Sequence, residues 1–299
     1  MSFAGLRRAG VLATLLLLAG CAGHGMTRHR GSGHGAAGRG WSDNLDLPQD
    51  ERYRDRSDSI PSGPPPDVSK IPEPVPKYEP RSLYGNKSPY TVLGQTYYVL
   101  PTARGYDERG IASYYGSKFD RYKTSNLEDY DMYKFSAASK VLPLPSYARV
   151  TNLQNGKSVI VRINDRGPFA ENRIIDLSYV AAVKIGIWPK GTGLVEVQGI
   201  APGEPVSELP RPRPSSRPGA AGPGIYLQVG AFGEAANAER VAAQLRAANF
   251  APVYVIEAVV NGRAVHRVRV GPLKDVETAD DVTARIERMG LPRPQVAVD

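Results

Sequence analysis

The sequence predicts an all-β barrel followed by a small α+β domain. Three observations support this fold class. Short β-rich segments with turn signals between them follow one another densely over residues 110–200, as in compact barrels. From residue 224 the rhythm changes to alternating strand and helix patterns. Residues 201–223 lie between the two and contain seven prolines, which predicts an extended linker.

Composition sets the outer limits of the prediction. The 299 residues allow roughly two domains, and the hydrophobic content of 41% is sufficient for their cores. The 31 glycines and 26 prolines indicate that much of the chain is turn or linker. The net charge of +8 favours an anionic partner, which can be nucleic acid, a membrane surface or an acidic wall polymer.

The N-terminal residues have the pattern of a secretory signal. Arg7-Arg8 precede the apolar run of residues 11–18, and small residues follow. This run is too short to span a bilayer. Cys21, the only cysteine, follows Leu18-Ala19-Gly20, and the run resembles a bacterial lipobox, which implies lipidation at Cys21. The alternative is an ordinary signal peptide with an incidental thiol. Lipidation would place the protein in the cell envelope and disfavour nucleic acid as the partner.

Residues 22–81 show no hydrophobic period and are rich in Gly, Pro, Ser and Arg, which predicts a disordered tether. Its histidines, His24, His29 and His34, are irregularly spaced, so a solvated tether is favoured over a metal site. Residues 90–94 and 96–100 then predict a short hairpin that leads into the barrel.

Within the barrel, residues 147–153 and 157–164 are β-rich and are joined through Asn155-Gly156, a strong hairpin signal. Alternation places Val159, Val161 and Ile163 on one face, and by the same parity Asp165 should emerge at the rim of the interior. Residues 178–185 predict one short helix that ends at Gly186.

Two aspartates are candidate acids. Asp165 ends a β-rich segment and is followed by Arg166 and a Gly-Pro turn. A carboxyl at such a bend can serve as a general acid in a cleft, although the same residues are also ordinary turn chemistry. Asp176 precedes the short helix, and a capping role at its N-terminus is the favoured interpretation.

The C-terminal segment predicts the order β-α-β-β-α-β, with the helices on one face of a sheet. Its predicted strands are residues 225–232, 253–256, 265–270 and 295–298. Apolar residues at helical spacing mark the two helices: Ala238, Val241, Ala242 and Leu245 in the first, Ala279, Val282, Ile286 and Met289 in the second.

Several motifs together resemble the rare lipoprotein A family, the septal-ring lytic transglycosylases of Gram-negative bacteria. The resemblance covers about 90 contiguous residues and is carried by residues 110–116, 124–128, 130–132, 142–147, 149–152, 164–169 and 173–178. The terminal segment resembles a SPOR domain through residues 226–232, 237–239 and 267–272. The first resemblance implies a double-psi β-barrel, and the second implies binding of glycan strands stripped of their stem peptides.

The family resemblance also implies a mechanism. A lytic transglycosylase cleaves between N-acetylmuramic acid and N-acetylglucosamine without water, because the muramoyl C6 hydroxyl attacks its own anomeric carbon. One carboxyl can act first as acid and then as base. The family's catalytic aspartate matches Asp165 and its essential glutamate matches Glu128. A glutamate close to Asp165 would raise one of the two pKa values. No metal and no cofactor is implied.

The chain departs from the family pattern at two histidines. Ser139 replaces the histidine of a Thr-Ala-Ala-His-Lys run, and Asp120 replaces the histidine of Phe-His-Gly. We therefore expect Ser139, Arg166 and Tyr115 to position the substrate, with Arg166 facing substrate or solvent. Tyr115, like Tyr114 and Phe119, can either stack on sugars or belong to the core.

In the SPOR-like segment, the expected glycan contacts are Gln228, Phe232 and Arg269. Expected partners are peptide-free glycan strands, the membrane through Cys21 and division-ring proteins, but not nucleic acid. Ala22 after the cysteine favours the outer membrane, facing the periplasm at the septum. The expected parts are a signal peptide (1–20), the lipidated cysteine with its tether (21–81), a lead-in hairpin (82–109), the barrel (110–200), the linker (201–223) and the SPOR domain (224–299).

Two functions follow from these expectations. The first is a lytic transglycosylase, a lyase, that cuts peptide-free glycan during septal wall processing and daughter-cell separation. The alternative is a catalytically weak or inactive glycan-binding lipoprotein, whose barrel has lost turnover with the histidine that Ser139 replaces.

Overall fold

The computed structural model describes residues 58–59, 61, 63–170, 172–209, 224–250, 252–260 and 262–298. Among these residues, no helix has the length and apolar character needed to cross a membrane. The predicted signal run, Cys21, the three tether histidines and most of the proline-rich linker lie outside the described residues. The predictions about them therefore stay predictions.

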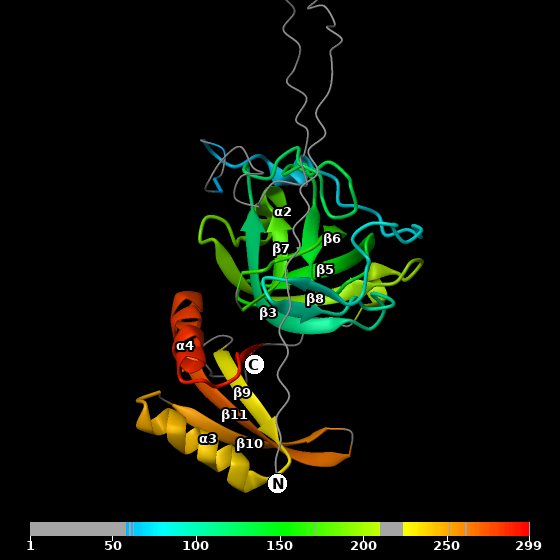
Figure 1. Ribbon diagram of the computed structural model, residues 1–299. Helices are drawn as coiled ribbons and strands as arrows, with labels where there is room; N and C mark the ends of the chain where they lie inside the picture. The colour runs from blue at the N-terminus through cyan, green and yellow to red at the C-terminus, as the bar shows by residue number, and fades with distance from the viewer. Residues whose placement is uncertain are drawn as a thin grey trace, which may run out of the picture. The chain divides into compact units, whose positions relative to one another are not determined.

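Six strands close into a barrel in the order β3-β7-β4-β6-β5-β8 (Figure 1). The pairs β3–β7 and β4–β6 are parallel, and the other pairs are antiparallel. This confirms the predicted barrel, although its first strand begins at Asp107 rather than Gly110. The strands are β3 (Asp107–Tyr115), β4 (Ser136–Ser139), β5 (Ser146–Asn152), β6 (Ser158–Asp165), β7 (Arg173–Ser178) and β8 (Thr192–Ile200).

The barrel interior is filled by aliphatic side chains. Val159, Val161 and Ile163 of β6 are buried, as alternation predicts. The predicted short helix is α2 (Tyr179–Ile185), which packs against β3, β6 and β7. It ends at Gly186, whose φ of +73° is the left-handed conformation that favours glycine at a helix C-terminus.

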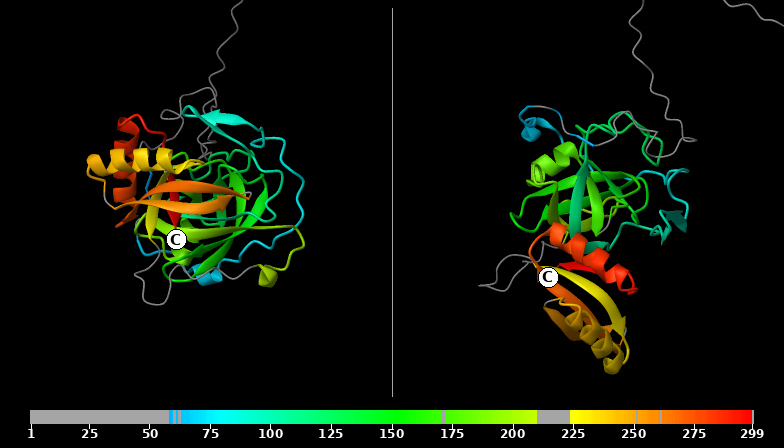
Figure 2. Two further views of the ribbon diagram at one scale, coloured as in Figure 1. Left: turned by 90° about the horizontal axis from the view of Figure 1, so that it is seen from below. Right: turned by 60° about the vertical axis from the view of Figure 1, so that its left-hand side comes forward.

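The segment before the barrel runs around its outside (Figure 2). This lead-in segment, residues 67–100, contains the 3₁₀-helix η1 (Val68–Lys70) and the predicted hairpin of β1 (Tyr90–Val92) and β2 (Gln95–Tyr97). The Glu73 carboxylate accepts a hydrogen bond from the Ile160 amide at 2.9 Å. The prediction of a disordered tether up to Arg81 is therefore wrong for residues 67–81.

The barrel also extends past its predicted end. A short 3₁₀-helix, η2 (Val206–Glu208), follows β8. Leu209 is buried against Tyr147 and Ile200 of the barrel. An apolar residue in this position anchors the chain, so the extended spacer that we predicted from Ala201 cannot begin before residue 210.

The terminal domain is the predicted β-α-β-β-α-β unit. Its strands lie in the order β10-β11-β9-β12, and all pairs are antiparallel. The elements are β9 (Ile225–Phe232), α3 (Ala235–Ala247), β10 (Val253–Val260), β11 (Arg263–Leu273), α4 (Val276–Arg288) and β12 (Gln295–Val298).

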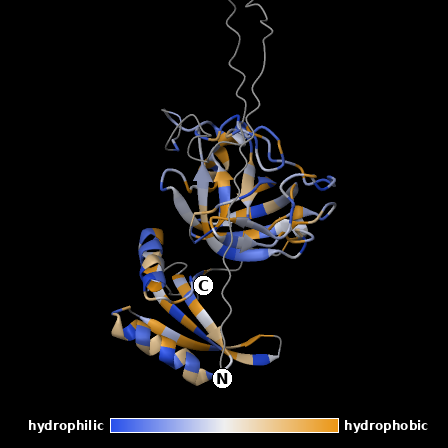
Figure 3. Ribbon diagram, in the orientation of Figure 1, coloured by the Kyte–Doolittle hydropathy of each residue, from blue (hydrophilic) through white to orange (hydrophobic). Residues whose placement is uncertain are grey.

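The two faces of this sheet differ in polarity, and polar and apolar residues alternate over residues 267–270 of β11 (Figure 3). Leu227 of β9 and Val268 of β11 are buried in one cluster with Leu245 of α3 and Ile286 of α4. Both helices therefore cover the same face. The other face carries the polar residues of the same strands.

Candidate active site

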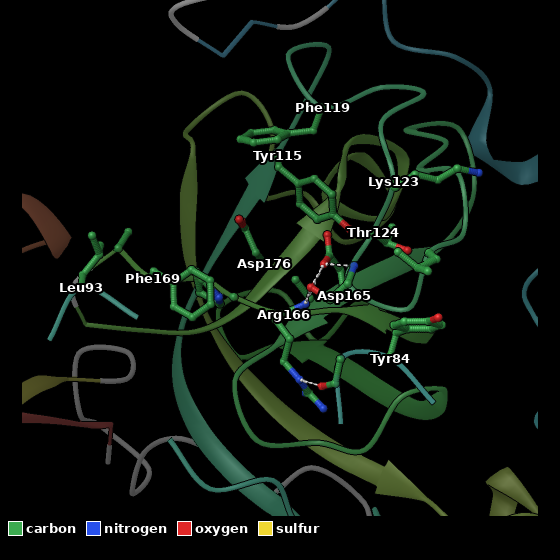
Figure 4. Close-up of a pocket in the computed structure, with 17 residues that line it drawn as sticks. Tyr84, Leu93, Tyr115, Phe119, Lys123, Thr124, Asp165, Arg166, Phe169 and Asp176 are labelled. Atoms are coloured by element: carbon green, nitrogen blue, oxygen red, sulfur yellow. Dashed lines mark hydrogen bonds between the residues drawn. The ribbon is translucent and has the colours of Figure 1, made fainter. Parts of the chain in front are cut away.

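Two aspartates flank a single alanine in the middle of the barrel wall. Strand β4 lies between β6 and β7, and Ala138 is the register partner of both Asp165 and Asp176. With about 4.8 Å between neighbouring strands, the Cα atoms of the two aspartates lie about 10 Å apart. The small Ala138 side chain leaves the space between them open. All three residues line one pocket of about 740 Å³, the acid pocket (Figure 4).

A bulge in β6 brings Asp165 to this position. The β4–β6 ladder shifts register after Ala137, whose partner is Ile163, so that Ala138 meets Asp165 and not Asn164. Bulges of this kind re-aim side chains next to functional sites. The bulge places Asp165 on the face of Ala138 and not on the face of Ile163. The predicted parity of Asp165 with Val161 and Ile163 is therefore wrong, because alternation does not show the bulge.

One oxygen of Asp165 is held by the loop of residues 124–128 and by its own neighbour. Oδ1 accepts hydrogen bonds from the Ser125 amide at 2.8 Å, the Ser125 hydroxyl at 2.6 Å and the Arg166 amide at 2.7 Å. Burial raises the pKa of this carboxyl above its ordinary value, although these hydrogen bonds act in the opposite direction. Oδ2 receives no hydrogen bond from the described residues.

Asp176 does not have three hydrogen bonds on one oxygen as Asp165 has, and it retains its proton to higher pH. Burial, with the nearby charges of Asp58 and Asp165, raises its pKa to about 7, although a hydrogen bond from Ser113 lowers it. Its Oδ1 is buried without a hydrogen-bond partner among the described residues. The predicted capping role is wrong, because the N-cap of α2 is Ser178 and no side chain caps this helix.

Tyr115 forms part of the pocket wall and part of the core. Its ring stacks on Tyr130 with 4.2 Å between centroids and contacts the edge of Phe119. The side chain is buried, and burial, with the charges of Asp165 and Asp176, raises the pKa of its hydroxyl well above the ordinary value. The structure therefore favours the core interpretation, with the ring edge facing the acids.

Glu128 does not meet Asp165. It lines a second pocket of about 870 Å³, the ion-pair pocket, together with Arg162 and Asn164. Glu128 accepts hydrogen bonds from both terminal nitrogens of Arg162 and, at 3.1 Å, from Asn164. Burial raises the pKa of Glu128, but these partners outweigh burial and hold it below its ordinary value. The prediction that Glu128 and Asp165 lie close enough to raise one of the two pKa values is wrong, because the pKa of Glu128 is lowered and Glu128 is not a cause of the raised pKa of Asp165.

A hydrogen-bond network connects Glu128 to the loop that supports Asp165. The amide of Asn126 donates to Glu128 at 2.9 Å, and the Thr124 hydroxyl donates to Asn126 at 2.6 Å. From the other side, Glu79 of the lead-in segment accepts from Arg162 at 2.9 and 3.0 Å. Glu128 therefore fixes the loop from which Ser125 reaches Asp165.

Arg166 lines the acid pocket, but its guanidinium is bound by groups of the fold. Its guanidinium donates to the carbonyl oxygens of Gly85 at 2.6 Å and Ser139 at 2.9 Å, and to the Leu142 carbonyl. It also donates to the Asn86 side chain at 3.2 Å. These contacts join the lead-in segment and a turn to the barrel, which gives Arg166 a structural role. The expectation that it also positions the substrate stays a prediction.

Ser139 is also removed from the pocket. It is only 1% exposed, and its hydroxyl accepts hydrogen bonds from the amides of Val141 at 3.3 Å and Leu142 at 3.1 Å. It does not line the acid pocket. The expectation that Ser139 positions the substrate is wrong, since its hydroxyl closes a turn.

In the terminal domain, a polar row crosses the sheet on the face away from the helices. Arg269 pairs with Gln228 and with Tyr254, and Gln228 pairs with Gln295. Residues paired in this way share a face. The sequence does not predict Tyr254 and Gln295 as members of this row, because only the strand order β10-β11-β9-β12 brings them level with the other two.

Phe232 does not belong to this row. It pairs with His266, which alternates with Arg267 and Arg269 and so lies on the helix side. Phe232 packs against the hydrophobic core of the domain. The prediction that it contacts glycan beside Gln228 is therefore wrong. The cause is a register shift between Val268 and Arg269, which alternation in the sequence does not show.

Comparison with known proteins gives consistent matches for both domains. Residues 107–198 match the family model described as lytic transglycolase, and residues 221–296 match the SPOR domain model. The endolytic peptidoglycan transglycosylase RlpA of Pseudomonas aeruginosa strain UCBPP-PA14 is 40% identical over 280 residues, which cover 76% of this chain and 81% of the relative. The protein of the same name from Vibrio cholerae is 39% identical over 239 residues, covering 80% and 86%.

One solved structure also matches. The crystal structure of the RlpA SPOR domain from Pseudomonas aeruginosa is 35% identical to the matched residues. The match covers 25% of this chain and 97% of that chain, with a TM-score of 0.24.

Proposed function

The chain belongs to the RlpA family of endolytic peptidoglycan transglycosylases, as its motifs predict, and we propose that it cleaves peptide-free glycan strands at septa and leaves 1,6-anhydromuramyl ends. The observation that carries this proposal is the pair Asp165 and Asp176 on either side of Ala138 in one pocket. Two carboxyls in different environments can divide the work of acid and base between them.

The environments assign the two roles. Asp176 has a pKa of about 7 and a carboxyl oxygen without a partner, so it holds the proton near neutral pH. Asp165 has three donors on one oxygen, and these favour its ionised form. Asp176 is therefore the general acid and Asp165 the general base. This replaces the expectation that a single carboxyl at Asp165 serves twice.

The reaction then needs no solvent nucleophile. Asp176 gives its proton to the glycosidic oxygen as the bond from the muramoyl C1 to that oxygen breaks. Asp165 takes the proton of the muramoyl C6 hydroxyl as O6 bonds to C1. Proton transfer from Asp165 back to Asp176 restores the starting state. Each bond and each proton is thereby accounted for.

Glu128 supports this chemistry without donating a proton. Its lowered pKa keeps it ionised near neutral pH, and it fixes the loop that carries Ser125. It is a positioning residue. The replacement of the family histidine by Ser139 does not disturb the carboxyl pair, because the Ser139 hydroxyl accepts hydrogen bonds from turn amides and its carbonyl accepts one from Arg166. This favours retained turnover over the inactive alternative.

The terminal domain supplies binding to the wall. The row of Tyr254, Arg269, Gln228 and Gln295 offers one cation, two amides and a phenol on one sheet face, and these groups suit the oxygens and carboxylates of a glycan strand. Lipidation of Cys21, attachment to the outer membrane and contact with division-ring proteins complete the proposal. They rest on the sequence pattern alone.

The proposal is tested with sacculi that an amidase has stripped of stem peptides. The purified chain is incubated with them, and soluble products are examined by mass spectrometry for anhydromuramyl ends. We expect such ends from the unaltered chain and none from Asp165→Asn or Asp176→Asn. Hydrolytic products with free reducing ends would contradict the transglycosylase mechanism, and absence of any product would favour the binding-only alternative.

The binding role is tested separately in the full chain carrying Asp176→Asn, which should not degrade the ligand. We expect it to sediment with peptide-free sacculi in preference to untreated sacculi. Adding Gln228→Ala and Arg269→Ala should abolish this preference, whereas Phe232→Leu should not. Equal binding to both kinds of sacculi by the chain with an unaltered sheet would contradict the proposed recognition of peptide-free strands.

A further inference from the structure

We propose that Tyr84, in the lead-in segment, is a stacking platform for a sugar ring of the bound glycan, so that the substrate cleft is built by more than the barrel. This inference rests on the proposed function and names a residue that positions its substrate. Tyr84 lies outside residues 107–198, which match the lytic transglycolase model, and it had no role in the sequence predictions.

Its position in the pocket is the first support. Tyr84 and Leu93, both from the lead-in segment, line the acid pocket together with Asp165. Figure 4 shows them on opposite sides of Asp165. Tyr84 is nevertheless 58% exposed and Leu93 is 79% exposed. Because both residues line the same pocket, their exposed apolar surface is part of a groove, and exposed apolar surface gathered at a groove is typical of ligand-binding sites.

The second support is the way the backbone beside Tyr84 is fixed. The carbonyl of Gly85 accepts the Arg166 hydrogen bond, and the Gly85 φ is +74°. A Cβ at Gly85 would lie 2.8 Å from the Ser125 carbonyl oxygen. Ser125 and Arg166 are the two residues that donate hydrogen bonds to Asp165. The platform is therefore held against the same groups that hold the catalytic carboxyl.

The third support is the chemistry of the ring. Among the described residues, the Tyr84 side chain has no hydrogen bond and no aromatic partner, so nothing in the fold requires a tyrosine there. The apolar face of a pyranose presents C–H groups that pack on an aromatic ring, and the phenol hydroxyl at the ring edge can bond a sugar hydroxyl. An N-acetylated sugar of the glycan strand is the ligand that suits both properties.

Tyr98 offers a matched control. It belongs to the same lead-in segment and is 67% exposed, but it does not line the acid pocket. In the full chain, Tyr84→Ala should lower kcat/KM on peptide-free glycan about 3- to 10-fold, the value of one aromatic stacking contact. The kcat at saturating glycan and the pH profile should stay unchanged. Tyr84→Trp should retain most of the activity, and Tyr98→Ala should equal the unaltered chain.

A binding measurement keeps the inference testable without turnover. Short peptide-free glycan oligomers are titrated calorimetrically into the full chain carrying Asp176→Asn, Gln228→Ala and Arg269→Ala, with and without Tyr84→Ala. We expect Tyr84→Ala to weaken binding by the same 3- to 10-fold. Equal affinity, or no binding in either form, overturns the role of Tyr84. Turnover with unchanged kcat/KM in Tyr84→Ala overturns it as well, and leaves the proposed function intact.

Discussion

The loop of residues 124–128 separates two carboxylate sites with opposite chemistry. On one side, Asp165 and Asp176 form no ion pair with any described residue, and both pKa values are raised. On the other side, Glu128 binds both terminal nitrogens of Arg162, and its pKa is lowered. All three carboxyls are partly buried, so burial alone does not decide the direction of the shift.

The difference shows how the barrel raises the pKa of a buried carboxyl: no described cation forms an ion pair with it. Arg166 follows Asp165 directly and could have paired with it. Three backbone carbonyls bind its guanidinium instead, and the lead-in segment supplies one of them, from Gly85. A buried carboxyl without a cation retains its proton at higher pH, and a carboxyl with one does not. Single substitutions in either pocket should therefore change the protonation of its carboxyl or the contacts that hold it.

The largest loss of activity should come from replacing the proposed proton donor, Asp176. Asp176→Asn keeps the shape of the side chain but cannot give a proton, so kcat on peptide-free glycan should fall by about 10²- to 10⁴-fold. Asp165→Asn should fall comparably, because the base is lost. Anhydromuramyl ends released per unit time provide the measurement. Turnover within 10-fold of the unaltered chain in Asp176→Asn would show that Asp176 is not the acid.

The two sites should also affect stability in opposite directions. The folded pKa of Asp176 is raised to about 7, so the native state binds more protons than the unfolded state from about pH 4 to 7. Stability from this group is therefore lost as pH rises through that window. At pH 8, Asp176→Asn should gain up to about 4 kcal/mol.

Glu128→Gln is the matched opposite case. The lowered pKa of Glu128 contributes stability above its unfolded value, and that contribution is lost as pH falls. The change should therefore destabilise the protein at pH 8, by a smaller amount, since the 40% exposed carboxylate is screened by solvent. Urea unfolding at pH 4 and pH 8 measures both variants. If the free energy of unfolding changed in the same direction in both variants at pH 8, the environments of Asp176 and Glu128 would not differ in the way described.

The sequence was sufficient for the elements of both domains, because their signals are local. Alternation in β6, the Asn155-Gly156 turn and the glycine after α2 are each read within a few residues. The lead-in segment was mistaken for tether as far as Arg81, because proline-rich composition resembles disorder. Its attachment depends on distant partners such as Glu73 with the Ile160 amide, which composition does not encode.

Pairing across strands was the part of the site that could not be predicted. The Gly-Pro turn after Asp165 is visible in the sequence and predicts a carboxyl at a bend. Asp176 lies just before a short helix, and this position predicts a helix cap and not a second acid. Only the ladders that join each to Ala138 reveal the carboxyl pair. The same applies to Phe232, which a register shift turns to the core. Side-chain direction after a bulge is a tertiary property.

Filling the gap between the two acids should have the next largest effect on activity. Ala138→Val adds two methyl groups where the substrate must reach both carboxyls, and overpacking of this kind costs about 1 to 3 kcal/mol. We expect kcat/KM to fall by roughly 10- to 100-fold. Ala137→Val, one residue earlier and on the buried core, should cost similar stability. If both variants lost activity equally, overpacking rather than blockage would explain the loss.

The smallest effect should come from loosening the ion-pair pocket without removing its charge. Arg162→Lys keeps a cation beside Glu128 but cannot reproduce the forked contacts to Glu128 and Glu79, so the loop that carries Ser125 should become less well fixed. We expect kcat to fall by about 2- to 10-fold with no shift in the pH profile, because the acid pair is intact. Arg109→Lys is the control, since the Arg109–Glu196 ion pair of 3.0 Å lies in the barrel but lines neither pocket. A displaced pH profile in Arg162→Lys would mean that the charges of the ion-pair pocket change the pKa values of Asp165 and Asp176. The two pockets would then be electrostatically coupled across the loop, and not independent as proposed.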